Sequence, residues 1–240
     1  MIVIPMAGLS SRFFKAGYKK PKYMLEAHGQ SLFSHAVSSF SEYFQKEKFL
    51  FIVRDILGTV DFLKQEIANL GIHNAHFFIL EEETRGQAET VYLGLQSLPL
   101  SDEPITIFNI DTFRPGFRYP ENITDWDGYL EVFKGEGDNW SFAKPVNNSS
   151  SKVAETAEKR PISALCSTGL YYFKSIELFN RSYCDYLGKS ASDWEKGELY
   201  IAPLYNYLIN QKSEIHYHLI DRNEVIFCGV PDEYLEFLEG

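Results

Sequence analysis

The segment from Met6 to Lys22 combines small and hydroxyl-bearing residues with a group of cations. Gly8 has no Cβ, so the backbone there can turn sharply and approach a ligand closely, and Ser10 and Ser11 add hydroxyl groups. Residues 1–25 contain no Asp or Glu, although the chain has a formal net charge of -10. The cations of this segment are Arg12, Lys15, Lys19, Lys20 and Lys22. A basic loop of this kind after a strand predicts a site for a phosphate-bearing anion.

The strand before this loop is the apolar run Ile2–Ile4, which we expect to end at Pro5. Two common glycine motifs do not fit the loop. A dinucleotide-binding fingerprint would need glycine where the chain has Ser10 and Phe13, and a P-loop would need Gly-Lys-Ser/Thr where it has residues 13–15. The loop therefore belongs to neither of these phosphate-binding classes.

The stretch is similar to the N-terminal signature of the nucleotidyltransferases that make nucleotide-activated sugars. That pattern runs Gly-x-Gly-Ser/Thr-Arg, followed after about ten residues by Pro-Lys. The matching residues are Gly8, Ser11, Arg12, Pro21 and Lys22, and Ser10 stands in place of the second glycine. The resemblance implies that Arg12 and Lys22 act in catalysis and that nucleotide is bound by Met6, Ala7, Gly8, Leu9, Ser10, Ser11, Arg12 and Lys22. The alternative is a strand followed by a solvated basic loop.

A second polar group, Asn109-Ile110-Asp111-Thr112, follows the apolar run Ile105–Ile110. Ligands of open α/β sheets bind at the carboxyl ends of strands, and an aspartate there can hold Mg²⁺, which prefers carboxylate, phosphate and water oxygens. The alternative is that Asp111 only caps the following turn. In the family that the loop resembles, the matching aspartate binds the catalytic metal, so the resemblance implies Mg²⁺ as cofactor on Asp111, with Asn109 near the nucleotide.

The segment Glu83–Thr90 also follows a predicted strand. Gly86 and Ala88 are small enough for a flat base to lie against the backbone, and Gln87 offers both a donor and an acceptor. The segment is similar to the family's base-binding Gly-Gln/Thr-Ala element. The resemblance implies nucleotide contact by Glu83, Gly86, Gln87 and Ala88, with Gln87 reading the base.

Residues 153–159, 167–169 and 197–206 resemble the acceptor side of the same family. A bare Glu-Lys pair is usually solvated, but family members use such a pair to hold the phosphorylated acceptor. By resemblance, Lys159 would hold the phosphate group of the acceptor. Glu158 would contact a polar group on the remainder of the acceptor molecule. The acceptor-binding residues implied in this way are Trp140, Glu158, Lys159, Thr168, Gly169 and Tyr200.

One position departs from the family pattern. Many relatives have Trp-x-Asp-x-Gly-Thr near the C-terminus, and that aspartate completes the metal site. Here Phe227 stands at that position, while the Gly-x-Pro-Asp/Glu-Tyr part of the pattern is kept. Asp221 and Glu224 are the remaining candidates for a second metal ligand. His216 and His218 would lie on one face of a strand, but no third ligand accompanies them.

Apolar periodicity predicts the elements that position these residues. The expected strands are 49–53, 76–80, 105–110, 129–134, 141–144, 169–173, 215–219 and 225–227. The expected helices are 31–44, 60–70 ending at Gly71, one capped by Thr84 and reaching Leu98, 175–187, 202–211 and 232–238. Strand–helix alternation over the first 110 residues implies a parallel sheet with right-handed crossovers. We therefore expect a Rossmann-like α/β fold, with a mixed but mostly parallel sheet flanked by helices.

Composition limits the possible functions of this chain. Its 240 residues with 45% hydrophobic content suit one globular domain, divided into a nucleotide-binding half at 1–115 and an acceptor-binding half at 116–240. The net charge of -10 argues against nucleic acid or an anionic membrane as partner. Neither a spanning helix nor a signal peptide is evident. The three cysteines, Cys166, Cys184 and Cys228, show no zinc or redox spacing, so we expect reduced thiols and a cytoplasmic protein.

The expected reaction is nucleotidyl transfer from a nucleoside triphosphate to a small phosphorylated acceptor, with release of pyrophosphate. The start of the chain and residues 129–142 look most like the branch of the family that serves bacterial capsule and surface polysaccharides, including cytidylyltransferases that activate phosphoglutamine. This resemblance favours CTP and glutamine phosphate; the alternative is a sugar 1-phosphate with CTP, UTP or dTTP. A nucleotide-sugar-dependent glycosyltransferase would not need the loop from Arg12 to Lys22. A non-catalytic regulator would have lost Lys22 or Asp111.

Overall fold

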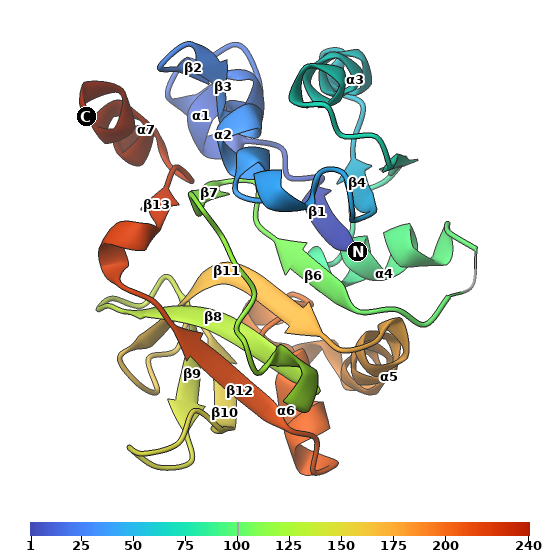
Figure 1. Ribbon diagram of the computed structural model, residues 1–240, viewed down its shortest axis with the longest axis vertical. Helices are drawn as coiled ribbons and strands as arrows, with labels where there is room; N and C mark the ends of the chain where they lie inside the picture. The colour runs from blue at the N-terminus through green and yellow to red at the C-terminus, as the bar shows by residue number, and fades with distance from the viewer. Residues whose placement is uncertain (100) are drawn as a thin grey trace. The chain divides into compact units, whose positions relative to one another are not determined.

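The computed structural model describes residues 1–99 and 101–240 (Figure 1). Three strands from the first third of the chain pair with one another in parallel. β1 (Ile2–Met6) pairs in parallel with β4 (Phe49–Val53), which pairs in parallel with β5 (Ala75–Ile79). Every residue of β1 and β4 is buried, as expected for parallel strands covered on both faces. The prediction that Pro5 ends the first strand was wrong, since β1 continues to Met6; the φ of proline is compatible with an extended backbone.

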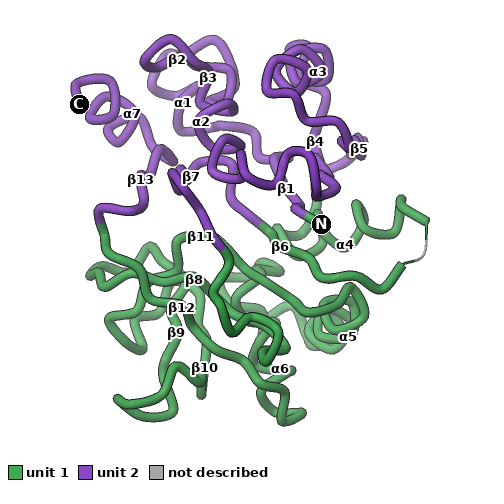
Figure 2. Tube along the Cα trace, viewed as in Figure 1, with its two compact units in different colours: residues 1, 84–107, 119–222 green, residues 2–83, 108–118, 223–240 purple. Residues whose placement is uncertain are grey.

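The chain forms two compact units, each assembled from separated segments (Figure 2). Unit 1 contains residues 1, 84–107 and 119–222, and unit 2 contains residues 2–83, 108–118 and 223–240. Neither unit is one half of the sequence, because the chain passes from one unit to the other more than once. The single domain over 1–240, with halves that meet at residue 115, stays a prediction.

Unit 2 contains the parallel strands β1, β4 and β5 and several short elements. Its helices are α1 (Ser11–Lys15), α2 (Leu32–Ser38), α3 (Thr59–Leu70) and α7 (Pro231–Glu239). Its short strands form two antiparallel pairs, β2 (Glu26–Ala27) with β3 (Gln30–Ser31) and β7 (Thr112–Phe113) with β13 (Ile226–Phe227). α3 is close to its predicted bounds and ends at Gly71, whose φ of 72° is the left-handed conformation that glycine adopts without strain.

Two elements of unit 2 differ from the sequence prediction. The helix predicted over 31–44 is shorter, because α2 ends at Ser38 and only a 3-10 turn follows at Ser41–Tyr43. The Ser39 hydroxyl accepts a hydrogen bond from the backbone N–H of Arg114, at 2.8 Å, which ties this point of the chain to residues far away in sequence. The segment after Ser10 was expected to be a loop, but it forms the five-residue helix α1.

Unit 1 is built around β11 (Leu165–Phe173), which is buried along its whole length. β11 pairs antiparallel with β8 (Gly128–Lys134) and with β9 (Ser141–Pro145). The strand β10 (Val153–Glu158), absent from the sequence prediction, pairs antiparallel with β9. β12 (Ile215–Leu219) pairs in parallel with β8 and matches its predicted bounds. Together with the parallel strands of unit 2, this arrangement confirms the predicted mixed α/β fold, in which helices flank a largely parallel sheet.

The helices of unit 1 are α4 (Gln87–Gln96), α5 (Ile176–Leu187) and α6 (Leu204–Asn210). The strand β6 (Ile105–Phe108) ends where the chain passes into unit 2. α5 and α6 pack on β11 through aromatic rings: Phe173 lies 5.3 Å from Phe179 of α5 and 4.6 Å from Tyr205 of α6, centroid to centroid. Within residues 1–99 and 101–240, no helix combines the length and the apolarity needed to cross a membrane.

The start of α4 corrects another prediction. Thr84 does not cap this helix; its hydroxyl lies 3.2 Å from the carbonyl of Gly86 and 2.6 Å from the hydroxyl of Thr90. The residue before the helix is Gly86, whose φ of 151° is one that side-chain-bearing residues rarely adopt. The chain therefore becomes helical only after Gly86.

The buried Tyr205 hydroxyl gives a test of packing in unit 1. It lies 2.8 Å from the carbonyl oxygen of Tyr172 and 3.0 Å from that of Tyr129, so Tyr205→Phe leaves buried acceptors without this donor. We expect the free energy of unfolding to fall by about 1–3 kcal/mol, measured by chemical denaturation. Tyr207→Phe, on the same helix but only half-buried, is the control and should change stability much less. Equal stability of both variants would contradict this assignment.

Candidate functional site

Ser10 organises the turn that follows β1. Its backbone is in the left-handed region, with φ 51° and ψ 31°, and its carbonyl accepts hydrogen bonds from the N–H groups of Phe13 (3.0 Å) and Phe14 (3.1 Å). These bonds begin α1, which carries Arg12. Gly8 is exposed, has no positive φ, and has no atom within 4 Å of the position that a Cβ would occupy. The strained turn that the sequence assigned to Gly8 is therefore at Ser10.

Lys22 and Asp111 form an ion pair at the end of this loop. The backbone N–H of Lys22 donates to the Ser10 hydroxyl at 3.1 Å, and Lys22 Nζ lies 2.6 Å from Asp111 Oδ2. Both side chains keep some exposure, 18% for Lys22 and 32% for Asp111, so the pair is within reach of a ligand. The structure thus brings together two residues that are 89 positions apart in the sequence.

The charge state of Asp111 follows from its surroundings. Burial raises the pKa of this carboxyl, but the charge and hydrogen bond of Lys22, a backbone hydrogen bond and the charge of Arg12 lower it, and the net shift is downward. Asp111 is therefore ionised at neutral pH. Because the pKa is lower in the folded protein, the stabilisation from this pair is present at neutral pH and is lost as pH falls through the folded-state pKa.

The C-terminal segment of unit 2 forms another wall beside Asp111. The N–H of Cys228 donates to the carbonyl of Asp111 at 2.8 Å, and the next residue is Gly229. A Cβ at Gly229 would lie only 3.1 Å from Asp111 Oδ2, so the glycine leaves room beside the carboxylate. Glu233 supports this turn, since its Oε2 accepts the N–H groups of Gly229 (2.7 Å) and Val230 (3.2 Å). Sequence reasoning missed these roles, although the Gly-x-Pro-Asp/Glu-Tyr pattern marked the segment.

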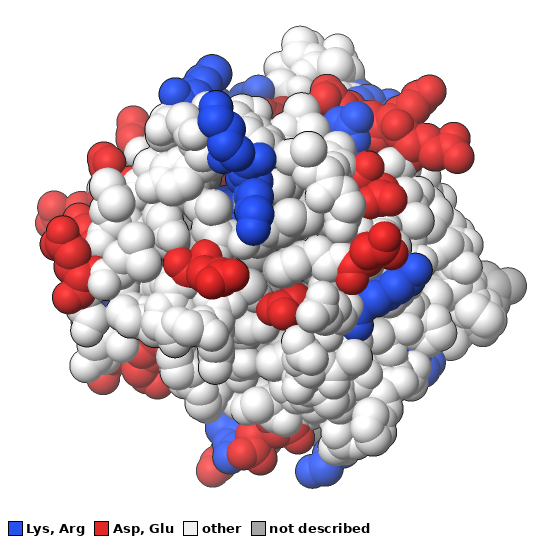
Figure 3. Space-filling model, turned by 90° about the horizontal axis from the view of Figure 1, so that it is seen from above, with Lys and Arg blue, Asp and Glu red and all other residues white. Residues whose placement is uncertain are grey.

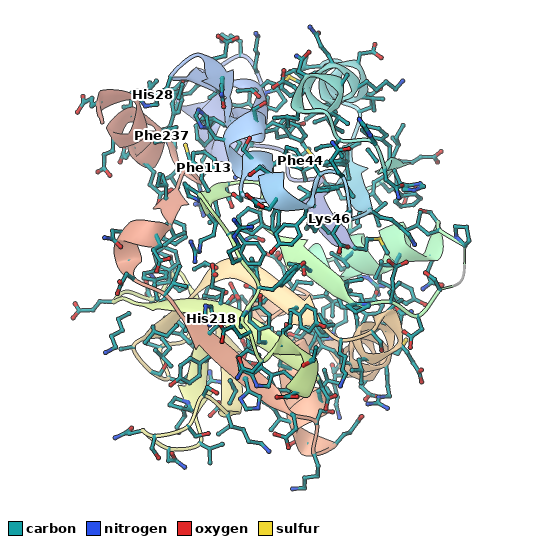
Figure 4. All side chains as sticks on the ribbon, in the orientation of Figure 1. His28, Phe44, Lys46, Phe113, His218 and Phe237 are labelled. Atoms are coloured by element: carbon teal, nitrogen blue, oxygen red, sulfur yellow. The ribbon has the colours of Figure 1, made fainter. Side chains whose placement is uncertain are left out.

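Helix α7 holds this C-terminal segment in place within unit 2 (Figure 4). The Phe237 ring lies 4.9 Å from the His28 ring and 5.1 Å from the Phe113 ring, centroid to centroid. The Tyr234 hydroxyl donates to the carbonyl of Glu26 at 2.8 Å. Because these contacts anchor α7 to the β2–β3 hairpin and to β7, they also fix Gly229 next to Asp111.

The residues considered for a second metal ligand have surroundings of their own. The Glu224 carboxylate lies 3.2 Å from the guanidinium of the buried Arg114, so its charge is already compensated. Phe227 lies opposite Thr112 in the β13–β7 pair, and Asp221 belongs to the other unit. Across residues 1–99 and 101–240, no three His, Cys, Asp or Glu side chains form a group that could hold a metal ion.

Other predicted nucleotide-binding residues of unit 2 are spread along strand ends. Met6 is the buried last residue of β1, and the carbonyl of Asn109 accepts the N–H of Thr112 at 3.3 Å. The exposed Glu83 carboxylate lies 3.1 Å from the Arg54 guanidinium. Ala7, Leu9, Ser11 and Arg12 are exposed or partly exposed, as residues that meet a ligand must be.

The predicted base-binding segment lies in unit 1, and the backbone packed against it explains why position 86 is glycine. Leu199 donates its N–H to the carbonyl of Arg85 at 2.9 Å and accepts the N–H of Ala88 at 2.8 Å. A Cβ at Gly86 would lie 2.5 Å from the N and O atoms of Leu199, so no larger residue fits. Ala88 is fully buried, and its methyl group is not available to a base. Gln87, the partly exposed first residue of α4, remains the candidate for base contact.

Three of the predicted acceptor-binding residues come together in unit 1. Lys159 Nζ donates to the Tyr200 hydroxyl at 2.6 Å, and the N–H of Lys159 donates to the carbonyl of Trp140 at 2.8 Å. Burial raises the pKa of the Tyr200 hydroxyl, and the charges of nearby glutamates raise it further. Tyr200 is therefore neutral at pH 7, and its hydroxyl accepts the hydrogen bond from Lys159 Nζ.

Glu158 and Thr168 are more enclosed than the resemblance implied. Glu158 is only 7% exposed; its carboxylate accepts a hydrogen bond from the Ser141 hydroxyl, and burial raises its pKa. Thr168 is buried and its hydroxyl lies 3.2 Å from Oε1 of the buried Glu131. Gly169, with φ 89°, lies in the irregular part of β11 between Ser167 and Tyr171. The Glu158 carboxylate and the Thr168 hydroxyl thus have hydrogen-bond partners inside the sheet.

Charge is unevenly distributed over the surface. Figure 3 shows a row of Lys and Arg side chains over the upper part of one face, with Asp and Glu side chains both next to the lower end of this row and toward the margins. The acidic chain, with its net charge of -10, therefore keeps a local positive region. Such a region attracts anionic ligands to one part of an otherwise acidic surface.

The fold is shared with solved structures of nucleotidyltransferases. A putative glucose-1-phosphate thymidylyltransferase from Bacillus anthracis matches with a TM-score of 0.77 and 16% identity, covering 99% of this chain and 93% of that one. The inositol-1-phosphate CTP transferase from T. maritima matches with a TM-score of 0.72 and 15% identity, covering 99% and 94%. At such identities these likenesses concern the fold alone. No protein-family profile matches the chain, and no curated protein matches it.

A much nearer relative identifies the family. The crystal structure of the nucleoside-diphosphate-sugar pyrophosphorylase from Vibrio cholerae RC9 is 59% identical in sequence, has a TM-score of 0.97, and covers 100% of both chains. The likeness extends over both units of the chain. The chain therefore belongs to the nucleoside-diphosphate-sugar pyrophosphorylase family of nucleotidyltransferases.

Proposed function

We propose that this protein transfers a nucleoside monophosphate from CTP to a small phosphorylated acceptor and releases pyrophosphate. Glutamine phosphate is the acceptor that we favour. The observation that carries the proposal is the Lys22–Asp111 pair, 2.6 Å apart at the end of a loop that also carries Arg12. A nucleoside triphosphate with Mg²⁺ carries negative charge, which Arg12 and Lys22 can bind, and positive charge, which Asp111 can bind. The reaction is expected in the cytoplasm, in the modification of capsular polysaccharide.

Asp111 fits the cation of such a substrate. Its carboxylate is ionised, belongs to the oxygen ligands that Mg²⁺ prefers, and has free space beside it because Gly229 lacks a Cβ. Bound there, Mg²⁺ would offset the negative charge that grows on the departing pyrophosphate. We propose that Asp111 is its one protein ligand.

The cationic side chains supply the remaining chemistry. Arg12 has a planar guanidinium that can hold two phosphate oxygens at once, whereas Lys22 is a point charge. In the proposed reaction, an oxygen of the acceptor phosphate attacks the α-phosphorus, and the bond to the pyrophosphate oxygen breaks. The attacking oxygen is already largely ionised at neutral pH, so no general base is required. Positioning and charge stabilisation then account for the rate.

Two chemical classes of acceptor are proposed. The resemblance of residues 129–142 to capsule cytidylyltransferases favours glutamine phosphate. The name of the Vibrio cholerae relative, a nucleoside-diphosphate-sugar pyrophosphorylase, favours a sugar 1-phosphate. In either case the acceptor phosphate would be held by Lys159, which is supported by Tyr200.

A pyrophosphate-release assay distinguishes these proposals. The purified protein is supplied with ATP, CTP, GTP, UTP or dTTP, each combined with glutamine phosphate or with a panel of sugar 1-phosphates. The highest kcat/KM is expected for CTP with glutamine phosphate. A higher value for a sugar 1-phosphate would establish the second candidate, and no release with any pair would contradict nucleotidyl transfer.

Lys22→Ala tests the phosphate contact. We expect kcat to fall by roughly 10²–10³, as usually follows loss of one preorganised charge-stabilising group, with little change in the melting temperature. Lys19→Ala, an exposed lysine of the same segment, is the matched control and should retain most activity. Wild-type turnover by a folded Lys22→Ala protein would remove Lys22 from the site.

Asp111→Asn tests the metal site. The partly exposed ion pair with Lys22 contributes modestly, so the free energy of unfolding should change by less than about 1 kcal/mol, while turnover at ordinary Mg²⁺ is abolished. Calorimetry should detect Mg²⁺ binding by the wild-type protein only with nucleotide present, and not by Asp111→Asn. Glu224→Gln, which alters the carboxylate paired with Arg114, is the control. Tight Mg²⁺ binding to the nucleotide-free protein, unchanged by Asp111→Asn, is the result that would refute the assignment.

Gln87→Ala tests base recognition. A site that hydrogen-bonds a base discriminates against bases that lack the matching group, so this change should reduce the ratio of kcat/KM for CTP over UTP. Gln96→Ala, at the exposed other end of α4, should leave the ratio unchanged. An unaltered ratio in Gln87→Ala would show that another residue reads the base.

A further inference from the structure

Ser10 has an unusual backbone for a residue with a side chain. Its φ of 51° and ψ of 31° place it in the left-handed region, where a Cβ is sterically unfavourable and glycine is at ease. The family signature has glycine at this position, so the backbone alone does not explain a serine. The feature that glycine cannot supply is the hydroxyl group.

The Ser10 hydroxyl binds the backbone at the base of Lys22. Its Oγ accepts the N–H of Lys22 at 3.1 Å. Lys22 begins a 3-10 turn (Lys22–Met24) directly after the buried Pro21, and the first N–H groups of such a turn have no acceptor within it. The serine therefore supplies the acceptor that fixes the start of this turn, from which the Lys22 side chain extends to Asp111 Oδ2.

The same serine also begins the helix that carries Arg12. Its carbonyl accepts the N–H groups of Phe13 and Phe14, and α1 is anchored by the Phe13 ring, which is 1% exposed and lies 5.5 Å from the Tyr18 ring. The backbone of Ser10 thus fixes α1, and its side chain fixes the start of the Lys22 turn. Ser10 is therefore hydrogen-bonded both to the helix that carries Arg12 and to the backbone of Lys22.

We propose that Ser10 is a positioning residue, which holds Lys22 at the distance from Arg12 and Asp111 that a triphosphate requires. The inference rests on the proposed function, because it gives Lys22 the role of a phosphate-binding cation. Ser10 acts through Lys22 and need not touch the substrate for this effect. Since small misplacements of catalytic groups are costly in rate, loss of the hydroxyl should lower turnover even where the fold is unchanged.

Two substitutions separate the hydroxyl from the backbone. Ser10→Ala removes the hydroxyl and keeps the strained φ, whereas Ser10→Gly removes both. We expect Ser10→Gly to be at least as stable as Ser10→Ala, because glycine adopts the left-handed conformation freely, but we expect kcat to fall about tenfold in both. KM for the nucleotide should change by less than about threefold. Ser41→Ala, at an exposed serine elsewhere in unit 2, is the matched control.

A double-mutant cycle tests whether Ser10 acts through Lys22. In a Lys22→Ala background, adding Ser10→Ala should change kcat by less than about twofold, because the side chain that Ser10 positions is absent. A full tenfold loss in that background would overturn the proposal, as would restored wild-type kcat in Ser10→Gly.

Amide hydrogen exchange supplies a measurement that does not depend on activity. The N–H of Lys22 should exchange faster in Ser10→Ala than in the wild-type protein, while the amides of β4 keep their rates. Unchanged exchange at Lys22 would overturn the proposal even if kcat fell. If the wild-type protein released no pyrophosphate with any substrate pair, that would contradict the proposed function, and the Lys22 exchange rate would still decide whether Ser10 fixes this backbone.

Discussion

The ion pair between Lys22 and Asp111 is the interaction on which the candidate site of unit 2 depends. It joins the loop after β1 to the residues that precede β7, and it is only partly exposed. A carboxylate surrounded by positive charge remains ionised, as the lowered pKa of Asp111 indicates. The pair therefore presents a cation and an anion side by side, which is the combination that a metal-bound triphosphate requires.

The surroundings of this pair are formed by segments that have little stability of their own. The five-residue helix α1 depends on the burial of Phe13, and the two-residue strands β7 and β13 depend on one another. Helices this short are marginal in water, because nucleation costs more than a few backbone hydrogen bonds return. Helix α7 compensates by packing Phe237 against the rings of His28 and Phe113 (Figure 4). The geometry at Asp111 is thus maintained by contacts along the whole C-terminal segment.

Burial separates supporting residues from ligand-binding residues in unit 1. Glu158, Thr168 and Ala88 were all inferred from motifs, but each is buried, with the polar ones hydrogen-bonded inside the sheet. Gly86 is required by the backbone of Leu199. Lys159 and Tyr200 form a polar pair, with Lys159 Nζ donating to the Tyr200 hydroxyl. Fewer of the side chains inferred from these motifs are accessible to a ligand than the motifs contain.

The sequence by itself determined the fold class and most of the longer elements, and it supplied the charged residues that we propose for the site. A continuous apolar run such as 49–53 is typical of a strand buried on both faces, and the spacing from Gly8 to Lys22 predicts a phosphate-binding loop. Tertiary structure decided the left-handed turn at Ser10, the late start of α4, the pairing of Glu224 with Arg114 and the closeness of Gly229 to Asp111. These features depend on atoms brought together from distant positions, and no local pattern of side chains encodes such distances, because packing of the whole unit sets them.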